Sequence, residues 1–250
     1  MADQTDCNGS CILISIEAPN RESLYDCYRD YLVFMSLVRD GVTSFQYKVF
    51  GFCWLKDQCL MLIQPEVPAV GDFLLKILKR YHFWLLQRGP EMTEYKLQML
   101  ELKQSSWVLD SLRFIHQNAV KRKVVDDAMD YHWHSYHVYN GFWSVNWLET
   151  EFILNQFAQT RLAAMSRFRQ YMLHPPSLDF KTLLDDLDCS SKYITESTPQ
   201  NRAVAEINSP YHQSMFDSTE VCLLTVDDKL HVQVRVLSEN NGISDIGRVG

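Results

Sequence analysis

The sequence contains few of the residues that interrupt regular structure, with 9 glycines and 8 prolines among 250 residues. This composition excludes a repetitive or loop-dominated architecture. No apolar run approaches the roughly 18 residues that a membrane-spanning helix needs. The first residues, MADQTDCNGS, also lack the basic start of a secretory signal. We therefore expect a cytoplasmic protein with no membrane partner.

Cysteine provides neither a disulfide framework nor an evident zinc site. The seven cysteines are odd in number and form no CxxC pair. Most of them lie in apolar runs such as FGFCWL and QCLMLI. We therefore expect buried free thiols and no bound metal.

Charge is distributed unevenly along the chain. The 24 basic and 31 acidic side chains give a net charge of −7, of which −1 belongs to residues 1–178 and −6 to residues 179–250. Residues 72–123 hold ten basic and five acidic residues and so carry +5. A basic central segment followed by an acidic extension leaves nucleic-acid binding open, although the whole chain is acidic.

Strand and helix patterns alternate in the first half of the chain. Four strands are predicted over 11–17, 44–55, 59–64 and 94–101. Three helices are predicted over 21–40, 70–87 and 105–118, the first of them ending at Asp40-Gly41. The order β-α-β-β-α-β-α predicts an α+β fold of the ferredoxin-like, split β-α-β type, an antiparallel sheet with helices packed on one face.

A compositional boundary follows at His174-Pro175-Pro176. Before it, helical patterns predict two further helices over 147–157 and 161–173. After it, the chain becomes acidic and rich in Ser and Thr, and residues 221–237 alternate on both sides of Asp227-Asp228, which predicts a β-hairpin. We therefore expect one domain over 10–175 and an acidic C-terminal extension over 179–250.

Three segments carry a family resemblance: LRFIHQNAVKRKVV (112–125), DYHWHSYHVYNG (130–141) and WLETEFILNQFAQTRLAAMSRFRQYM (147–172). They are similar, in order, to the R-Y-I-x-x-N-P-V-[RK]-x-x-[LM]-V signature, the D-Y-x-W-S-S-Y-x-x-Y-x-G element and the closing helix pair of the REP-associated tyrosine transposases. That family is a branch of the single-tyrosine HUH transposases, which act on hairpin-forming single-stranded DNA. The resemblance covers roughly residues 10–175.

The resemblance implies DNA transposition by a tyrosine nucleophile beside a divalent metal held by two histidines. The histidine motif corresponds to GFCWLKDQCLMLIQP, where Gln58 and Leu60 stand at the histidine positions, and Phe114 stands at the tyrosine position. Leucine cannot bind a metal, glutamine is a weak oxygen ligand, and phenylalanine has no hydroxyl. We therefore expect that cleavage of the family type is lost and that no metal cofactor is used.

DNA binding does not need the substituted groups, because hairpin recognition uses basic side chains on phosphates and exposed aromatic side chains under unpaired bases. For Asn118, a structural cap on the turn is favoured over a base contact, because Ala119 replaces the proline of the motif. The predicted nucleic-acid-binding residues are Lys76, Lys79, Arg80, Arg113, Asn118, Lys121, Arg122 and Lys123.

Other chemically capable side chains are expected to be structural. His116 should face away from the family's site, since it lies two residues after Phe114 on a helix. Tyrosines 47, 81 and 95 are expected in the core or at its rim. In the HWHSYH stretch, Tyr131 and Trp133 should be buried and three histidines exposed, at positions 132, 134 and 137.

These observations favour a transposase-like regulator that has lost catalysis and binds hairpin-forming single-stranded DNA or structured RNA. An alternative is a protein-interaction module that uses the aromatic-rich stretch 131–147 as an exposed patch and binds a partner through 179–250. A third is an active transposase with relocated catalytic residues. The acidic extension is also a candidate for autoinhibition, by competing with phosphate for the basic surface.

Overall fold

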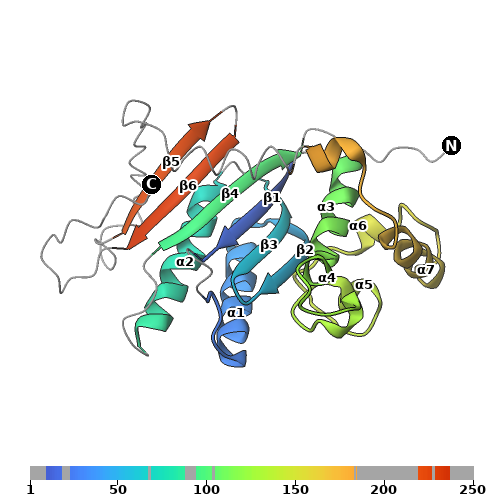
Figure 1. The fold of residues 1–250 in the computed structure, drawn as a ribbon, viewed down its shortest axis with the longest axis horizontal. Helices are drawn as coiled ribbons and strands as arrows, with labels where there is room; N and C mark the ends of the chain where they lie inside the picture. The colour runs from blue at the N-terminus through green and yellow to red at the C-terminus, as the bar shows by residue number, and fades with distance from the viewer. Residues whose placement is uncertain are drawn as a thin grey trace, which may run out of the picture.

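The computed structural model describes residues 10–18, 23–66, 69–87, 94–102, 105–182, 184, 219–226 and 229–236. Its sheet is built on four strands, β1 (Cys11–Glu17), β2 (Lys48–Leu55), β3 (Gln58–Gln64) and β4 (Glu94–Leu102). They lie in the order β2-β3-β1-β4 with every neighbour antiparallel (Figure 1). This is the arrangement of a split β-α-β fold, so the predicted α+β class is confirmed.

A C-terminal hairpin extends the sheet. It consists of β5 (Thr219–Val226) and β6 (Lys229–Val236), close to the predicted span of 221–237. β6 pairs antiparallel with β4, which gives a six-stranded sheet that ends at β5. The chain therefore returns to its own sheet near the C-terminus. Most of the acidic extension, and so the autoinhibition hypothesis, lies outside the described residues.

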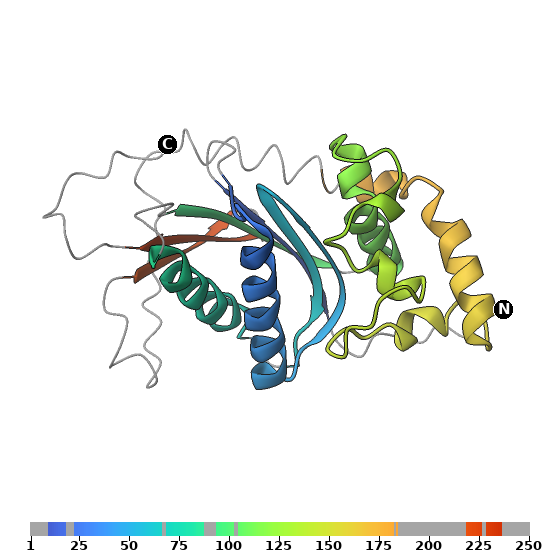
Figure 2. The same cartoon turned by 90° about the horizontal axis from the view of Figure 1, so that it is seen from below.

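One face of the sheet is covered by α1 (Tyr28–Phe45) and α2 (Val70–Leu86), which lie side by side in Figure 2. The strands present alternate apolar residues to these helices, because successive side chains point to opposite faces. α1 differs from the predicted helix over 21–40, since it starts at Tyr28 and continues through Gly41. A Cβ at Gly41 would lie 3.0 Å from the Phe73 ring, so this glycine permits close helix packing rather than ending the helix.

The opposite face carries α3 (Ser106–His116) and the short α4 (Asn118–Lys121), and α3 packs over β2 and β3. The contact is close at Gly51, where a Cβ would lie 2.5 Å from Leu112 Cδ2. β2 also has a register irregularity between Val49 and Gly51. The third helix of the pattern therefore belongs to a second layer, across the sheet from the first two.

The aromatic-rich stretch after α4 contains η2 (Ala128–Asp130) and α5 (Tyr136–Tyr139) and packs along the edge of β2. Its backbone bonds directly to the strand, for example Trp54 N–H to Trp133 O at 2.9 Å and Ser135 N–H to Phe52 O at 2.9 Å. The prediction of an exposed aromatic patch at 131–147 is therefore wrong for its centre, where Trp133, Tyr136 and Tyr139 are buried. The stretch protects an edge strand that would otherwise be free to pair.

Two further helices follow, α6 (Glu151–Leu154) and α7 (Arg161–Met172). α6 is much shorter than the helix predicted over 147–157, whereas α7 matches its prediction over 161–173. α7 buries Ala164, Phe168 and Met172, which are spaced by four residues and so share one side of the helix. None of the described helices is both long and apolar enough to cross a membrane.

Candidate nucleic-acid-binding groove

A groove of about 210 Å³ opens on the face of the sheet that carries α3 and α4. Three positions singled out in the sequence meet there, namely Gln58 and Leu60 of β3 and Phe114 of α3. They are up to 56 residues apart in the chain (114 minus 58) and are brought together by the packing of α3 on β3. The remaining lining residues are Leu13, Ser15, Glu17, Gln98, Leu100, Asn118, Lys121, Arg122 and Leu184.

Strand register explains the polar floor of this groove. Glu17 of β1 lies opposite Gln58 of β3, while Ser15 lies opposite Leu60 on one side and Gln98 of β4 on the other. Directly opposed residues of antiparallel strands share a face, so these side chains form adjacent rows under α3 and α4. The rows change from leucine at one end of the groove to carboxylate and amide groups at the other.

Gln58 is the centre of a hydrogen-bond network in the floor. Its Nε2 donates to Glu17 Oε1 at 2.8 Å and to Ser15 Oγ at 3.4 Å. Its Oε1 accepts from Asn118 Nδ2 at 2.9 Å and from Arg122 Nη1 at 3.3 Å. Both ends of the amide are therefore engaged, and the network links β1 and β3 to α4.

These residues do not fit the divalent metal of the HUH transposases. Leu60 and Phe114 have no ligand atom, and the Oε1 of Gln58 faces the guanidinium of Arg122, which would repel a cation. Within the described part of the chain, no group of three or more His, Cys, Asp or Glu side chains is placed to hold a metal ion.

Phe114 gives the groove an aromatic wall. The residue is half-buried, its ring centroid lies 6.5 Å from that of Phe180, and Lys121 Nζ lies 5.3 Å above the ring. Among the described residues that line the groove there is no tyrosine. The arrangement offers a stacking surface beside a cation, which suits a nucleobase next to a phosphate.

The basic run after α3 lies at the rim of the groove. Lys121 and Arg122 line it, and Lys123 is exposed in the turn that follows, with a φ of 58°. Arg122 also pairs with Asp57 at 2.5 Å, so part of its charge is compensated within the protein. These three residues keep their predicted role as phosphate contacts, a role that is still a prediction.

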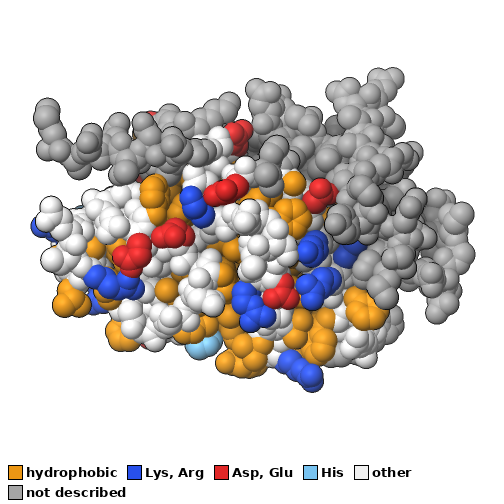
Figure 3. Space-filling view, turned by 180° about the vertical axis from the view of Figure 1, so that it is seen from behind, with side chains coloured by type: hydrophobic (Ala, Val, Ile, Leu, Met, Phe, Trp, Pro, Cys, Tyr) orange, Lys and Arg blue, Asp and Glu red, His pale blue; other side chains and the backbone are white. Residues whose placement is uncertain are grey.

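The basic residues of α2 lie on the other face of the sheet. Lys76 Nζ bonds to Ser44 Oγ at 3.2 Å, and Arg80 lies 3.6 Å from Asp40 on α1. Lys79 shares this helix and is half-buried. Figure 3, the view from behind the sheet of Figure 1, shows basic and acidic side chains interspersed there rather than a single basic surface. Lys76, Lys79 and Arg80 therefore cannot form one binding surface with Lys121–Lys123.

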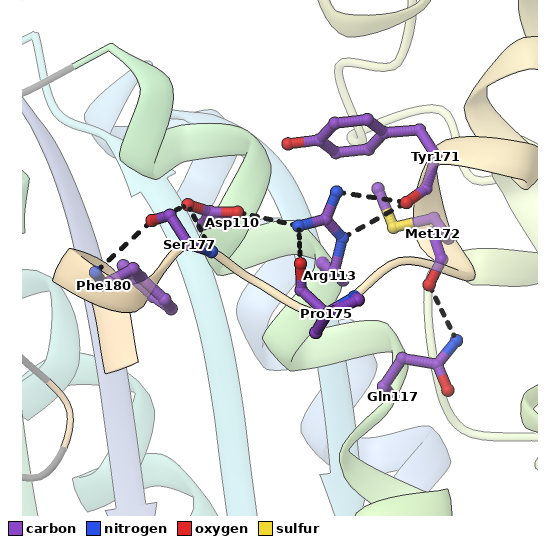
Figure 4. A network of polar contacts seen from close by, with 8 residues as sticks. All are labelled: Asp110, Arg113, Gln117, Tyr171, Met172, Pro175, Ser177 and Phe180. Atoms are coloured by element: carbon purple, nitrogen blue, oxygen red, sulfur yellow. Dashed lines mark hydrogen bonds and ion pairs between the residues drawn. The ribbon is translucent and has the colours of Figure 1, made fainter. Parts of the chain in front are cut away.

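Arg113 is not available to phosphate, so its predicted role is wrong. The residue is 4% exposed, and its guanidinium pairs with Asp110 at 2.9 Å (Figure 4). It also donates to the carbonyl oxygens of Tyr171 and Pro175, at 3.1 Å and 2.8 Å. Asp110 in turn accepts from Ser177 Oγ at 2.5 Å. This buried clamp fastens the chain after α7 onto α3.

The predicted role of Asn118 as a nucleic-acid contact is also wrong. It is 2% exposed and donates to Gln58, so it neither reaches a base nor caps its own turn with its side chain. Its amide approaches Cys53, whose pKa is raised to about 12 by burial. Cys11 and Cys59 are likewise buried free thiols, as predicted, whereas Cys27 is exposed.

The histidine predictions are confirmed in part. His116, the last residue of α3, is fully buried and shares a hydrogen bond of 2.8 Å with Ser135 Oγ, away from the groove. His134 is also buried, contrary to expectation, and its Nε2 lies 2.7 Å from Ala128 O. Burial, followed by nearby His137, lowers the pKa of His134 to about 4. His132 is exposed, and the three tyrosines at 47, 81 and 95 are buried.

Sequence reasoning missed three residues of the groove floor, Ser15, Glu17 and Gln98. Their signal was present, because CILISIE and EYKLQMLE both place polar residues at alternate positions. Such alternation is typical of a strand with one solvent-facing side. The polar side is instead partly covered by α3, α4 and the side chain of Leu184, which turns it into a groove.

No protein-family profile matches the sequence. No curated protein matches it either. A solved structure of a REP-associated tyrosine transposase bound to a REP hairpin is similar, with a TM-score of 0.45 and 13% identity over 56% of this chain and 86% of that chain.

Proposed function

We propose that the protein binds hairpin-forming single-stranded DNA or structured RNA in the groove between the sheet and α3–α4, without cleaving it, and acts as a regulator by occupancy. The observation that carries the proposal is the convergence of Gln58, Leu60 and Phe114 on one groove that has Lys121 and Arg122 at its rim. The three positions belong to separate motifs of the sequence, and their meeting in one groove supports the resemblance from which the proposed binding follows.

Different residues of the groove would contact different parts of the nucleic acid. Lys121, Arg122 and Lys123 would neutralise backbone phosphates, which makes binding sensitive to salt. Phe114 would stack against an unpaired base. Because Phe114 carries no hydroxyl and the floor does not suit a metal, the groove has the parts for binding but not for the family's cleavage reaction.

Fluorescence anisotropy with labelled single-stranded hairpins, measured at two salt concentrations, tests the proposal. We expect tight, salt-sensitive binding that prefers a hairpin to a scrambled strand of equal length. Charge reversal at Lys121, Arg122 and Lys123 should weaken binding and reduce its salt dependence by about one unit of slope per lost phosphate contact. Equal binding of hairpin and scrambled strand, or unchanged binding by the triple variant, would contradict the proposal.

Incubating the same hairpin with the protein and Mg²⁺ or Mn²⁺ tests the absence of cleavage. We expect an intact strand and no covalent protein–DNA adduct. Cleavage would instead favour the active transposase with relocated residues, and replacing each tyrosine by phenylalanine would then locate the nucleophile.

A protein-interaction module is the second candidate, and two exposed leucines favour it, one in α7 and one at its C-terminal cap. Leu162 and Leu173 are 82% and 75% exposed. They are eleven positions apart, which returns to nearly the same side of a helix. If these two leucines form an interface, Leu162→Asp and Leu173→Asp should abolish binding of the partner protein. If the partner instead binds the extension, deletion of residues 179–250 should abolish binding. Retention of the partner by both variants would exclude these surfaces.

A further inference from the structure

We propose that the groove is also a binding site for a free apolar α-amino acid of about the size of leucine. Glu17 and Gln98 would hold its ammonium group, and Lys121 and Arg122 would hold its carboxylate. The binding itself is independent of nucleic acid, whereas displacement of a strand by the amino acid rests on the proposed function.

The first observation is a buried acceptor without a partner. Gln98 is 7% exposed and lines the groove, and its Nε2 is closed off, so the amide atom that faces the groove is Oε1. None of the described residues donates a hydrogen bond to this oxygen. Most buried polar groups in native proteins are satisfied. An unsatisfied acceptor at a groove therefore points to a ligand that supplies a donor.

The second observation is a carboxylate with remaining acceptor capacity. One oxygen of Glu17 accepts from Gln58 at 2.8 Å, and the other lies 3.6 Å from Lys96 Nζ. A carboxylate has about four lone-pair sites, so these two partners do not exhaust it. Glu17 is half-buried and lines the groove, and its negative charge favours a donor that is a cation.

The two acceptors lie close enough to meet one ammonium group. Gln98 is paired with Ser15, two residues from Glu17 on the neighbouring strand. Diagonal neighbours of this kind are roughly 7–8 Å apart in their backbones, within reach of long side chains. An ammonium group has three N–H donors, enough for both acceptors at once.

The third observation is a cation without an anionic partner. Lys121 is exposed at the rim, its Nζ lies 5.3 Å from the Phe114 ring, and it forms no ion pair with any of the described residues. Arg122 lies beside it and shares its charge with Asp57. The rim therefore suits an anionic group, while the floor suits a cationic one.

The spacing of the two charges suits one small zwitterion. Arg122 Nη1 and Glu17 Oε1 bind opposite ends of the Gln58 amide, at 3.3 Å and 2.8 Å. Because that amide is short, the two charged atoms are at most about 8 Å apart. The ammonium and carboxylate groups of an α-amino acid are roughly 3 Å apart, and with a hydrogen bond at each end they span about the same distance.

The remainder of the groove is apolar. Leu13 lies opposite Leu100, and Ser15 lies opposite Leu60, so leucines follow the polar row along the sheet, and Phe114 stands above them. The volume of about 210 Å³ is below the roughly 300–1,000 Å³ of pockets that hold drug-sized ligands. These features favour a ligand with one apolar side chain, because a polar side chain would lose its water there without gaining a partner.

Isothermal titration calorimetry of the full chain with L-leucine tests the site. Isopentylamine lacks the carboxylate of leucine, isocaproate lacks its ammonium group, and L-glutamate has a charged side chain. We expect leucine to bind and each of the three analogues to bind at least about tenfold more weakly, because each loses a charge-assisted hydrogen bond or buries a charge. Isopentylamine or isocaproate binding as tightly as leucine would overturn the assignment.

Two variants test the two ends of the ligand. Gln98→Met removes an unpartnered amide at nearly constant volume, so the melting temperature should stay the same or rise while leucine affinity falls about tenfold. Gln117→Met is its matched control, since the Gln117 amide bonds to Met172 O outside the groove. Lys121→Met should weaken leucine but not isopentylamine, whereas Lys48→Met, at an exposed ion pair with Glu66, should change neither. Unchanged leucine affinity in both Gln98→Met and Lys121→Met would contradict the proposal.

A competition experiment with the labelled hairpin separates this proposal from the proposed function. If leucine binds and displaces the hairpin, both stand. If leucine binds and the hairpin does not, the amino-acid site stands and nucleic-acid binding fails. If the hairpin binds and millimolar leucine does not, the amino-acid site is wrong and nucleic-acid binding stands. If both bind without competing, they do not share the groove, which overturns the displacement. If neither binds, both proposals fail.

Discussion

The two faces of the sheet in this protein have opposite chemistry although they are made from the same strands. The face under α1 and α2 is apolar, with Ile14, Ile16 and Cys59 all at 1% exposure or less. The face under α3 and α4 carries Ser15, Gln58 and their polar neighbours. Because side chains alternate along a strand, adjacent residues of β1 point to opposite faces, one into the apolar layer and the next into the groove.

The two faces also differ in how their side chains pack. α1 and α2 contribute large aromatic side chains that interlock, such as Phe34 with Tyr81 at 5.1 Å between centroids in an edge-on geometry. The groove instead contains a hydrogen-bond network and an amide with no partner. A cavity among apolar residues would be costly on the first face, whereas the second tolerates an open space because its floor is polar.

Truncating one aromatic residue on each face should give the largest contrast. Phe73 on α2 is fully buried, so Phe73→Ala should lower the free energy of unfolding by about 3–5 kcal/mol. Phe114 is half-buried at the groove, and Phe114→Ala should cost only about 1 kcal/mol. Urea denaturation of both variants measures the difference. Equal losses would show that the groove is part of the structural core.

The clamp around Arg113 should behave as a stabilising element of the α3 side. Arg113→Ala leaves Asp110 buried without its partner, which typically costs about 3–5 kcal/mol. The double variant Arg113→Met/Asp110→Leu should recover much of that loss. Arg167→Ala, an exposed control on α7, should change stability by less than about 0.5 kcal/mol. A double variant no more stable than Arg113→Ala would contradict this account of the ion pair.

Acid should destabilise the α3 side through its buried histidines. The pKa of His134 is about 4 in the folded protein, below the ordinary value of about 6.5, because burial disfavours the cation. Burial also lowers the pKa of His116. As the pH falls from 6.5 to 4, the unfolded chain takes up protons that the folded chain does not, so stability decreases, by about 3 kcal/mol for His134.

Unfolding measured at several pH values tests this expectation. His134→Gln cannot titrate and should flatten the decrease, even if it lowers stability at pH 7. His132→Gln, at an exposed ring, should leave the pH dependence unchanged. A decrease that is identical in the wild type and His134→Gln would assign the effect to other groups.

Much of the fold could be predicted from the sequence, because apolar periodicity is set by burial. β3 and α2 begin and end within one residue of their predicted limits. α1 was less predictable, since Gly41 has the local signature of a helix end and its helical role depends on Phe73, a residue 32 positions away. The helix predicted over 147–157 failed for a related reason, because residues 148 and 149 bond to Val49 of β2 instead of continuing a helix.

Only those residues of the site that correspond to a position in a family motif could be predicted from the sequence. Gln58, Leu60 and Phe114 came from aligned motifs, and their meeting depends on tertiary packing that no local pattern contains. Arg113 was misassigned because its neighbours Tyr171 and Pro175 are about 60 residues away. Gln98 was missed because a polar residue in an alternating strand has the same pattern whether it faces water or a groove.

The smallest expected effect comes from charge reversal on the face without the groove. Lys76→Glu with Arg80→Glu should change hairpin affinity by less than about twofold, whereas Lys121→Glu with Arg122→Glu should reduce it by about tenfold or more. The reason is distance through the sheet, because exposed charges are screened beyond about 8–10 Å at ordinary ionic strength. Both double variants change the net charge by the same amount, so a general effect of acidity would lower both affinities equally. The salt dependence distinguishes the cases further, since it should fall by about two units of slope for the α4 pair and remain unchanged for the α2 pair. A loss of hairpin affinity confined to the α2 variant would place the binding surface over α1 and α2 and would contradict binding in the groove.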